Sequence, residues 1–146
     1  MIRYYMDEAA LSLPASRLVD RSVHEMDVET PEGARLHFAV VRRPLAAGEA
    51  VADKLGALLA EKERSLRGFS LISLEERRYP ALAGLEARLR YRGDPEIVYQ
   101  HQLHAAVSMG AESTWLAFHA ESKLEDAAAC DAWMAEVMGT IRLRDG

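Results

Sequence analysis

The side chains of this chain that most readily exchange protons or bind metals near neutral pH are its five histidines. They are scattered along the sequence as His24, His37, His101, His104 and His119. Only His101 and His104 are close neighbours, and a spacing of three residues in a strand puts two side chains on opposite faces. A metal site would need ligands from elsewhere, and no spacing typical of one is present. We therefore expect no metal and no other cofactor.

The nucleophilic residues are equally isolated. Ser22, in Asp-Arg-Ser-Val-His, lacks the glycines of a nucleophile elbow. Cys130 is the only cysteine, which rules out an internal disulfide and a multi-cysteine metal site. It shares a helical spacing with Ala127 and Met134, so we expect a small core residue. No phosphate-binding glycine loop or dinucleotide fingerprint is present. The sequence predicts a protein that is not an enzyme, with a small enzyme that uses Ser22 or a histidine as an alternative.

Two glutamines are the remaining candidates for specific recognition. Gln100 and Gln102 alternate along the chain after Val98, so the three share one face of a strand. An amide donates and accepts hydrogen bonds at once. Such a face can line a solvated groove, receive a partly apolar partner, or be an ordinary solvent face.

A predicted hairpin over residues 85–103 must position these glutamines. Its first strand has apolar residues at every second position, alternating with Glu86, Arg88, Arg90 and Arg92. This period of two is typical of a strand with one buried face. Gly93-Asp94-Pro95 suits the turn. On the second strand, Ile97, Tyr99 and Leu103 form the face opposite the glutamines.

The rest of the chain predicts further strands and two helices. We expect two short strands within 1–14, with a turn at Asp7-Glu8, and strands at 18–28, 34–42, 69–77 and 114–120, with a continuation of the hairpin at 104–107. A helix is predicted over 48–66 from its apolar stripe and the following Gly68. A second helix ends near Gly139, and Ser122 with Glu125 predicts a capping box at its start.

This order of elements predicts the fold class. Strands with hairpin-length connections favour a mostly antiparallel twisted sheet, and we expect the two main helices to pack on one face of it. The predicted fold is therefore α+β. The chain has 146 residues and no linker or internal repeat, so residues 1–146 are expected to form a single domain.

Charge and hydropathy limit the classes of partner and the cellular location that we expect. The net charge of −5 argues against nucleic acid as the main partner. No window is long and apolar enough for a transmembrane helix. Asp7 and Glu8 stand where a signal peptide would be hydrophobic, so we expect a cytoplasmic protein.

Several motifs, taken in order, resemble the Eag (effector-associated) chaperones of type VI secretion, a family that shares a PsbP-like fold with DcrB-type proteins. The N-terminal motifs are Tyr4, Asp7-Glu8, Leu13-Pro14 and Asp20-Arg21-Ser22-Val23-His24. The central ones are Leu36–Arg43, Gly48-Glu49 and Leu66-Arg67-Gly68-Phe69. The late ones are Arg90-Tyr91-Arg92-Gly93, Tyr99-Gln100-His101-Gln102, Trp133 and Ile141-Arg142-Leu143-Arg144. The resemblance spans nearly the whole chain.

The resemblance implies a cytoplasmic adaptor chaperone of homodimeric form with a PsbP-like sandwich fold. Such a chaperone binds the N-terminal transmembrane helices of a secreted effector, often of the Rhs type, before export, and neither inserts into the membrane nor catalyses a reaction. The residues that it implies for partner binding are Val23, Glu25, Leu58, Lys62, Leu66, Val98, Gln100 and Gln102. The chain departs from the family pattern at His24, Glu25 and Leu58, where asparagine, an apolar residue and glutamine are usual. A DcrB-like binding domain with an envelope-related role is the alternative.

Overall fold

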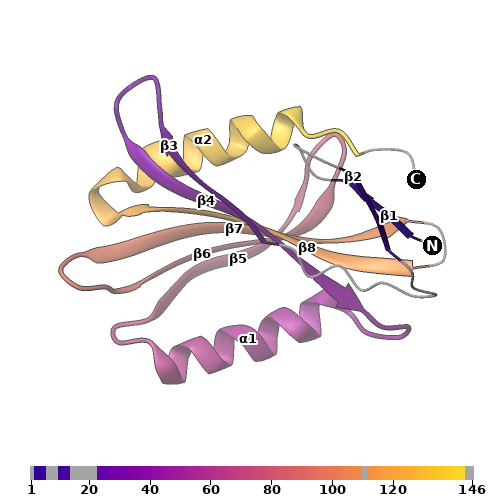
Figure 1. Ribbon diagram of the computed structural model, residues 1–146. Helices are drawn as coiled ribbons and strands as arrows, with labels where there is room; N and C mark the ends of the chain where they lie inside the picture. Colours follow the sequence, from indigo (N-terminus) through magenta and orange to yellow (C-terminus); the bar gives the residue numbers. More distant parts are fainter. Residues whose placement is uncertain (1, 6–9, 14–22, 110–111, 144–146) are drawn as a thin grey trace.

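The computed structural model describes residues 2–5, 10–13, 23–109 and 112–143 (Figure 1). Its main element is a six-stranded sheet made of β3 (Val23–Glu29), β4 (Arg35–Leu45), β5 (Ser70–Arg78), β6 (Ala83–Arg92), β7 (Ile97–Met109) and β8 (Glu112–Lys123). A separate two-stranded sheet contains β1 (Ile2–Tyr5) and β2 (Ala10–Leu13). The helices are α1 (Val51–Ser65) and α2 (Ala127–Thr140), and the 3₁₀ turn η1 (Leu124–Asp126) leads into α2.

The large sheet is antiparallel throughout, in the order β3-β4-β8-β7-β6-β5. The predicted hairpin is present as β6 and β7, with Arg92 opposite Ile97 and Leu85 opposite His104. Strand β7 continues to Met109 and pairs with β8 from Val98 to its end. The two long strands β7 and β8 therefore form the centre of the sheet, and the predicted α+β class with a mostly antiparallel sheet is confirmed.

The two helices cover opposite faces of the sheet, which lies between them in Figure 1. Strand β8 shows the division, because Trp115 and Ala117 pack with α1 whereas Phe118 and Ala120 pack with α2. The prediction that both helices pack on one face is therefore wrong. Both faces of the central strands carry apolar side chains, so each face needs its own cover. We call these two surfaces the α1 face and the α2 face.

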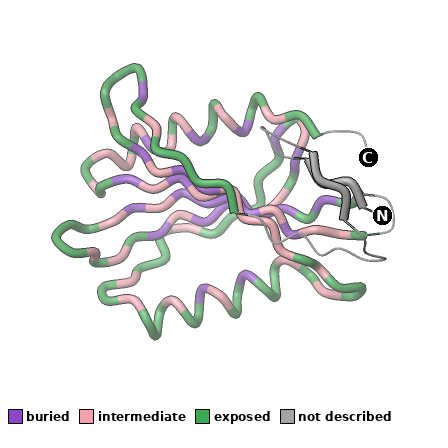
Figure 2. The backbone as a smooth tube through the Cα atoms, in the orientation of Figure 1, coloured by how far each residue is buried: buried purple, intermediate pink, exposed green. Residues whose placement is uncertain are grey.

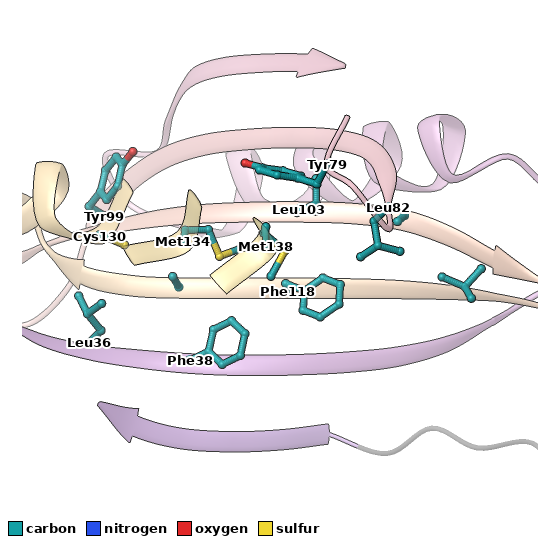
Figure 3. Close-up of a cluster of buried hydrophobic side chains, with 13 residues drawn as sticks. Leu36, Phe38, Tyr79, Leu82, Tyr99, Leu103, Phe118, Cys130, Met134 and Met138 are labelled. Atoms are coloured by element: carbon teal, nitrogen blue, oxygen red, sulfur yellow. The ribbon is translucent and has the colours of Figure 1, made fainter. Parts of the chain in front are cut away.

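The core of the α2 face is the larger one. Cys130, Met134 and Met138 point from α2 onto the sheet and are fully buried (Figure 3). They meet Leu103 from β7 and Phe118 from β8. The prediction that Cys130 is a small core residue is confirmed, and burial raises the pKa of its thiol to about 12.

The start of α2 differs from the predicted capping box. The hydroxyl of Ser122 donates to the carbonyl of Lys123 at 2.8 Å and caps no helix. The helical residues begin with the 3₁₀ turn at Leu124, and the α-helix proper starts three residues later. Strand β8 extends to Lys123, so Ser122 is a strand residue and its hydroxyl is used locally.

On the α1 face, Leu55 and Leu59 are buried against Leu89, Trp115 and Ala117. Burial of one such leucine contributes about 1.5–3 kcal/mol. After α1, the amide N–H of Arg92 donates to the carbonyl of Arg67 at 2.7 Å, which ties the end of the helix to the end of β6. This contact fixes where α1 lies across the sheet.

The outer strands are exposed on both faces. Every residue of β3 except Val28 is exposed, and the same holds for β5 except Ser73 (Figure 2). The helix α1 packs with residues of β4, β6, β7 and β8 and leaves the β3 end of its face uncovered. A partly open surface therefore borders α1.

Candidate functional site

The eight residues expected to bind a partner all come from elements that border the α1 face. Val23 and Glu25 lie opposite Val41 and Ala39 on the neighbouring strand β4, and Gln102 lies opposite His119 on β8. The expected residues lie on three elements: Val23 and Glu25 on β3, Leu58 and Lys62 on α1 with Leu66 at its C-terminal cap, and Val98, Gln100 and Gln102 on β7. Alternation along each strand puts those of β3 and β7 on the α1 face.

These residues do not form one compact cluster. Strands β4 and β8 separate β3 from β7, which corresponds to about 14 Å at three strand spacings. The residues between them were not among the expected ones: His37, Ala39, Val41, Ala117, His119 and Glu121. Along a strand, the residues that alternate with Leu36 and Phe38 must face away from the core that these two residues join. The alternation within 34–42 and 114–120 therefore indicated which residues form this second face.

A row of hydrogen bonds between polar side chains runs along the α1 face. Trp115 Nε1 donates to His104 Nδ1 at 3.0 Å. His104 must then carry its proton on Nε2, which donates to Gln102 Oε1 at 2.8 Å. Gln102 Nε2 in turn donates to Gln100 Oε1 at 2.7 Å. The three bonds all point the same way along β7.

The row ends on a carboxylate. Gln100 Nε2 donates to Glu121 Oε1 at 2.7 Å, and the Tyr91 hydroxyl donates to the same oxygen at 3.1 Å. Burial and the Glu121 charge raise the pKa of Tyr91 to about 12, so the phenol stays protonated as a donor. Every donor of the row points towards the negative charge of Glu121, an arrangement in which each bond strengthens the next.

His104 is held neutral in this row. Burial lowers the pKa of His104 to about 3, with smaller effects from His119 and Arg43. A neutral ring is what the row requires, since Nδ1 must accept from Trp115 while Nε2 donates to Gln102. His104 is fully buried, so in this position it can act neither as a metal ligand for an external ion nor as a solvent-facing base.

The expectation that Gln102 lies on an accessible face of the sheet is wrong. Its side chain is fully buried, and its amide oxygen and nitrogen are both engaged. Gln100 is half-buried and lies nearer the surface. Gln102 therefore positions Gln100 and does not itself touch a partner in this conformation.

Acidic side chains gather where β3 meets β4. Asp27 Oδ1 lies 3.0 Å from His37 Nδ1, and Glu25 Oε1 lies 3.6 Å from His37 Nε2. The hydrogen bond to Asp27, with the charges of Asp27, Glu121 and Glu25, raises the pKa of His37. Next to this cluster, an open groove of about 640 Å³ is lined by Asp27, Val28, Glu29, Arg35, Leu36, His37, Glu96, Ile97, Val98, Glu121, Ser122 and Lys123.

A second polar cluster lies on the α2 face and is closed. His101 Nδ1 lies 2.7 Å from Asp131 Oδ1, an oxygen that also accepts the hydroxyl of Tyr99. His101 Nε2 is 3.2 Å from Glu86 Oε2, but its N–H is not aligned for a hydrogen bond. The prediction that His101 and His104 lie on opposite faces is confirmed. His101 is almost fully buried and does not line the groove described above.

Within the described ranges, no group of three or more histidine, cysteine, aspartate or glutamate residues could hold a metal ion. Ser22 and the predicted turn at Asp7-Glu8 lie outside the described residues. Across the described chain, no helix is long and apolar enough to cross a membrane.

With this geometry established, comparisons with known proteins show the fold. The structure resembles PA94 of Pseudomonas aeruginosa, a protein of unknown function that has been suggested to be a regulator, with a TM-score of 0.76 and 17% identity over 100% of this chain and 99% of that one. It also resembles LpqN of Mycobacterium tuberculosis, a protein involved in cell envelope biogenesis, with a TM-score of 0.59 and 12% identity over 77% of this chain and 64% of that one.

No family model and no curated protein matches the sequence. At these identities the two structural likenesses establish a common architecture and carry no residue role to this chain. The roles of the site residues therefore follow from their own contacts.

Proposed function

We propose that this chain is a non-catalytic chaperone that binds an apolar helix of a partner protein on the uncovered part of the α1 face. The observation that carries the proposal is the composition of this surface. It combines the exposed Val23, the half-buried Val41 and Val98, and the small, mostly buried Ala39 with the amide of Gln100, which is held in place by hydrogen bonds.

Such a surface suits a helix that would otherwise lie in a membrane. An isolated transmembrane helix exposes a large apolar area to water and aggregates. Helices in membranes associate through small residues and interhelical hydrogen bonds, because lipid offers no hydrophobic gain. Ala39 allows close approach, and the second N–H of the Gln100 amide is available to a backbone carbonyl.

The resemblance to the Eag chaperones supplies the biological setting of this proposal. The chain then acts in the cytoplasm as an adaptor that shields the N-terminal transmembrane helices of a type VI secretion effector, of the Rhs type, before loading and export. In this setting it is also a homodimer, since two copies can clamp a partner with more than one helix.

We assign the dimer contact to the edge strand β5. Leu71, Ile72 and Leu74 are 41–50% exposed there, and Leu71 and Leu74 line an open groove together with Gly56, Leu59, Ala60, Glu63, Phe69 and Ser70. The sequence Glu75-Glu76-Arg77-Arg78 follows on the same edge. In an antiparallel pair of two such strands each glutamate can lie opposite an arginine, which is the self-complementarity that a two-fold axis requires.

The test is co-expression with the transmembrane-containing N-terminal segment of an effector encoded beside this protein, followed by affinity purification and mass measurement. We expect a stable complex with the original chain and its loss in Val23→Glu or Val98→Glu, because each puts a charge into the apolar contact. The matched control is Met26→Glu, since Met26 is 46% exposed against 53% for Val23 but lies on the opposite face of the same strand. Equal recovery of the partner by all variants would refute the proposal.

A second function is favoured by one finding, the shared architecture with LpqN, which is involved in cell envelope biogenesis. In that case the chain is a DcrB-like binding domain with an envelope-related role. It would then be recovered as a monomer, with no complex in the co-expression experiment.

A further inference from the structure

Two cations border the uncovered part of the α1 face without a carboxylate partner. Arg43 projects from β4, and its guanidinium carbon lies 4.8 Å from the centroid of the Trp115 ring. Lys62 follows the half-buried Leu58 by four residues on α1, so both project from the same side of the helix. Among the described residues, neither cation forms an ion pair with an aspartate or glutamate.

The charges of Lys62 and Arg43 both act on one residue of this face, His119. It lies on β8 opposite Ala39, in the middle of the face, with its ring centroid 5.4 Å from that of His104. Burial and the charges of Lys62 and Arg43 lower the pKa of His119 to about 4, so the ring is neutral at pH 7. The site therefore holds two positive charges beside two neutral imidazoles.

The acids of this face are already engaged or lie at its other side. Glu121 accepts hydrogen bonds from Gln100 and Tyr91, while Glu25 and Asp27 lie beside His37. The groups that act on His37 are all acidic, and those that lower the pKa of His119 besides burial are both basic. In a chain with a net charge of −5, this separation leaves one side of the open surface positive.

An apolar partner that covers this surface removes water from the two cations. A cation that is desolvated without a counter-ion costs free energy, whereas a carboxylate at hydrogen-bond distance offsets that cost. The purely apolar helix is therefore a poorer ligand than one with a single acid placed over this position.

We propose that Lys62 and Arg43 bind an aspartate or glutamate side chain carried by the apolar segment that docks on the α1 face. This inference rests on the proposed function and names the chemistry of the partner. The carboxylate lies against the neutral His119, with its neighbouring apolar residues over Ala39 and Val41. Among apolar segments, the site therefore prefers one that carries a single acidic residue at this position.

The experiment uses the purified full chain and three synthetic helical peptides as probes. Each peptide has eighteen alanine and leucine residues with one central variable position, a fluorescent label and a polyethylene glycol tail for solubility. The variable residue is glutamate, glutamine or lysine, and binding is followed by fluorescence anisotropy. We expect the glutamate peptide to bind about tenfold more tightly than the glutamine peptide, and the lysine peptide to bind most weakly.

Charge reversal on the protein tests the assignment. Lys62→Glu is expected to invert the ranking, so that the lysine peptide binds best. Arg64→Glu is the matched control, because it makes the same change in net charge two residues away on the exposed side of α1 and should leave the ranking unchanged. Equal binding of all three peptides, or inversion by Arg64→Glu as well, would overturn the inference while the proposed function stands. Absence of binding by every peptide would overturn both.

Discussion

Replacement of Gln102 by leucine removes the centre of the hydrogen-bonded row on the α1 face while it nearly preserves side-chain volume. The structure predicts the cost from two groups. His104 Nε2–H loses its acceptor in a fully buried position, and Gln100 Oε1 loses its donor. A buried polar group without a partner costs about 1–3 kcal/mol. Gln100 is half-buried, so water can reach its carbonyl and the second cost is smaller.

We therefore expect Gln102→Leu to lower the free energy of unfolding by about 2–4 kcal/mol, and Gln102→Ala by more because it adds a cavity. Urea unfolding followed by tryptophan fluorescence is a suitable assay, since Trp115 donates directly to His104 in the same row. Ser108→Ala is the control, because Ser108 lies on the same strand and face with an exposed hydroxyl contact to Ser113. The expected change there is below about 0.5 kcal/mol.

A result in which Gln102→Leu is as stable as the original chain would refute this reasoning. It would mean that the row contributes nothing beyond the volume of its side chains. Gln100 would then have no fixed orientation, and Gln102 would not act as its positioning residue.

Three further predictions follow from the same structure. Burial lowers the pKa of His104 to about 3 and that of His119 to about 4, from the usual 6.5, so below pH 6.5 the unfolded chain takes up protons that the native chain does not. Urea unfolding at pH 7, 6 and 5 should therefore show that the free energy of unfolding falls as the pH falls. His119→Gln should reduce this pH dependence by up to about 1.4 kcal/mol per pH unit. Cys130 should react with a disulfide reagent at pH 8 only as fast as the chain unfolds, since its thiol is fully buried with a pKa of about 12; immediate labelling of the native chain would contradict its position in the core. Leu74→Arg should convert the proposed dimer into a monomer in sedimentation experiments, whereas Met26→Arg on the other edge strand should not. A dimer that survives Leu74→Arg would exclude the assigned β5 contact.

The sequence by itself determined which segments form helices and strands and which alternate residues of each strand share a face. The period of two over residues 85–103 predicted the β6–β7 hairpin, and the apolar stripe over 48–66 predicted α1. The same periodicities predicted that Cys130 lies in the core and that His101 and His104 lie on opposite faces. These features are local, because the covalent geometry of a strand or helix repeats every few residues.

Tertiary structure alone decided which face each helix covers and what the two glutamines do. Strand β8 carries apolar side chains on both faces, with Trp115 and Ala117 on one and Phe118 and Ala120 on the other, so its pattern assigns neither helix to a face. Glutamine was expected at the surface because an isolated amide is rarely buried. Here the pairing register of β7 with β6 and β8 brings His104, Trp115 and Glu121 to Gln102 and Gln100. These partners lie up to 21 residues away in the chain, and with them the amides satisfy their hydrogen bonds inside the protein.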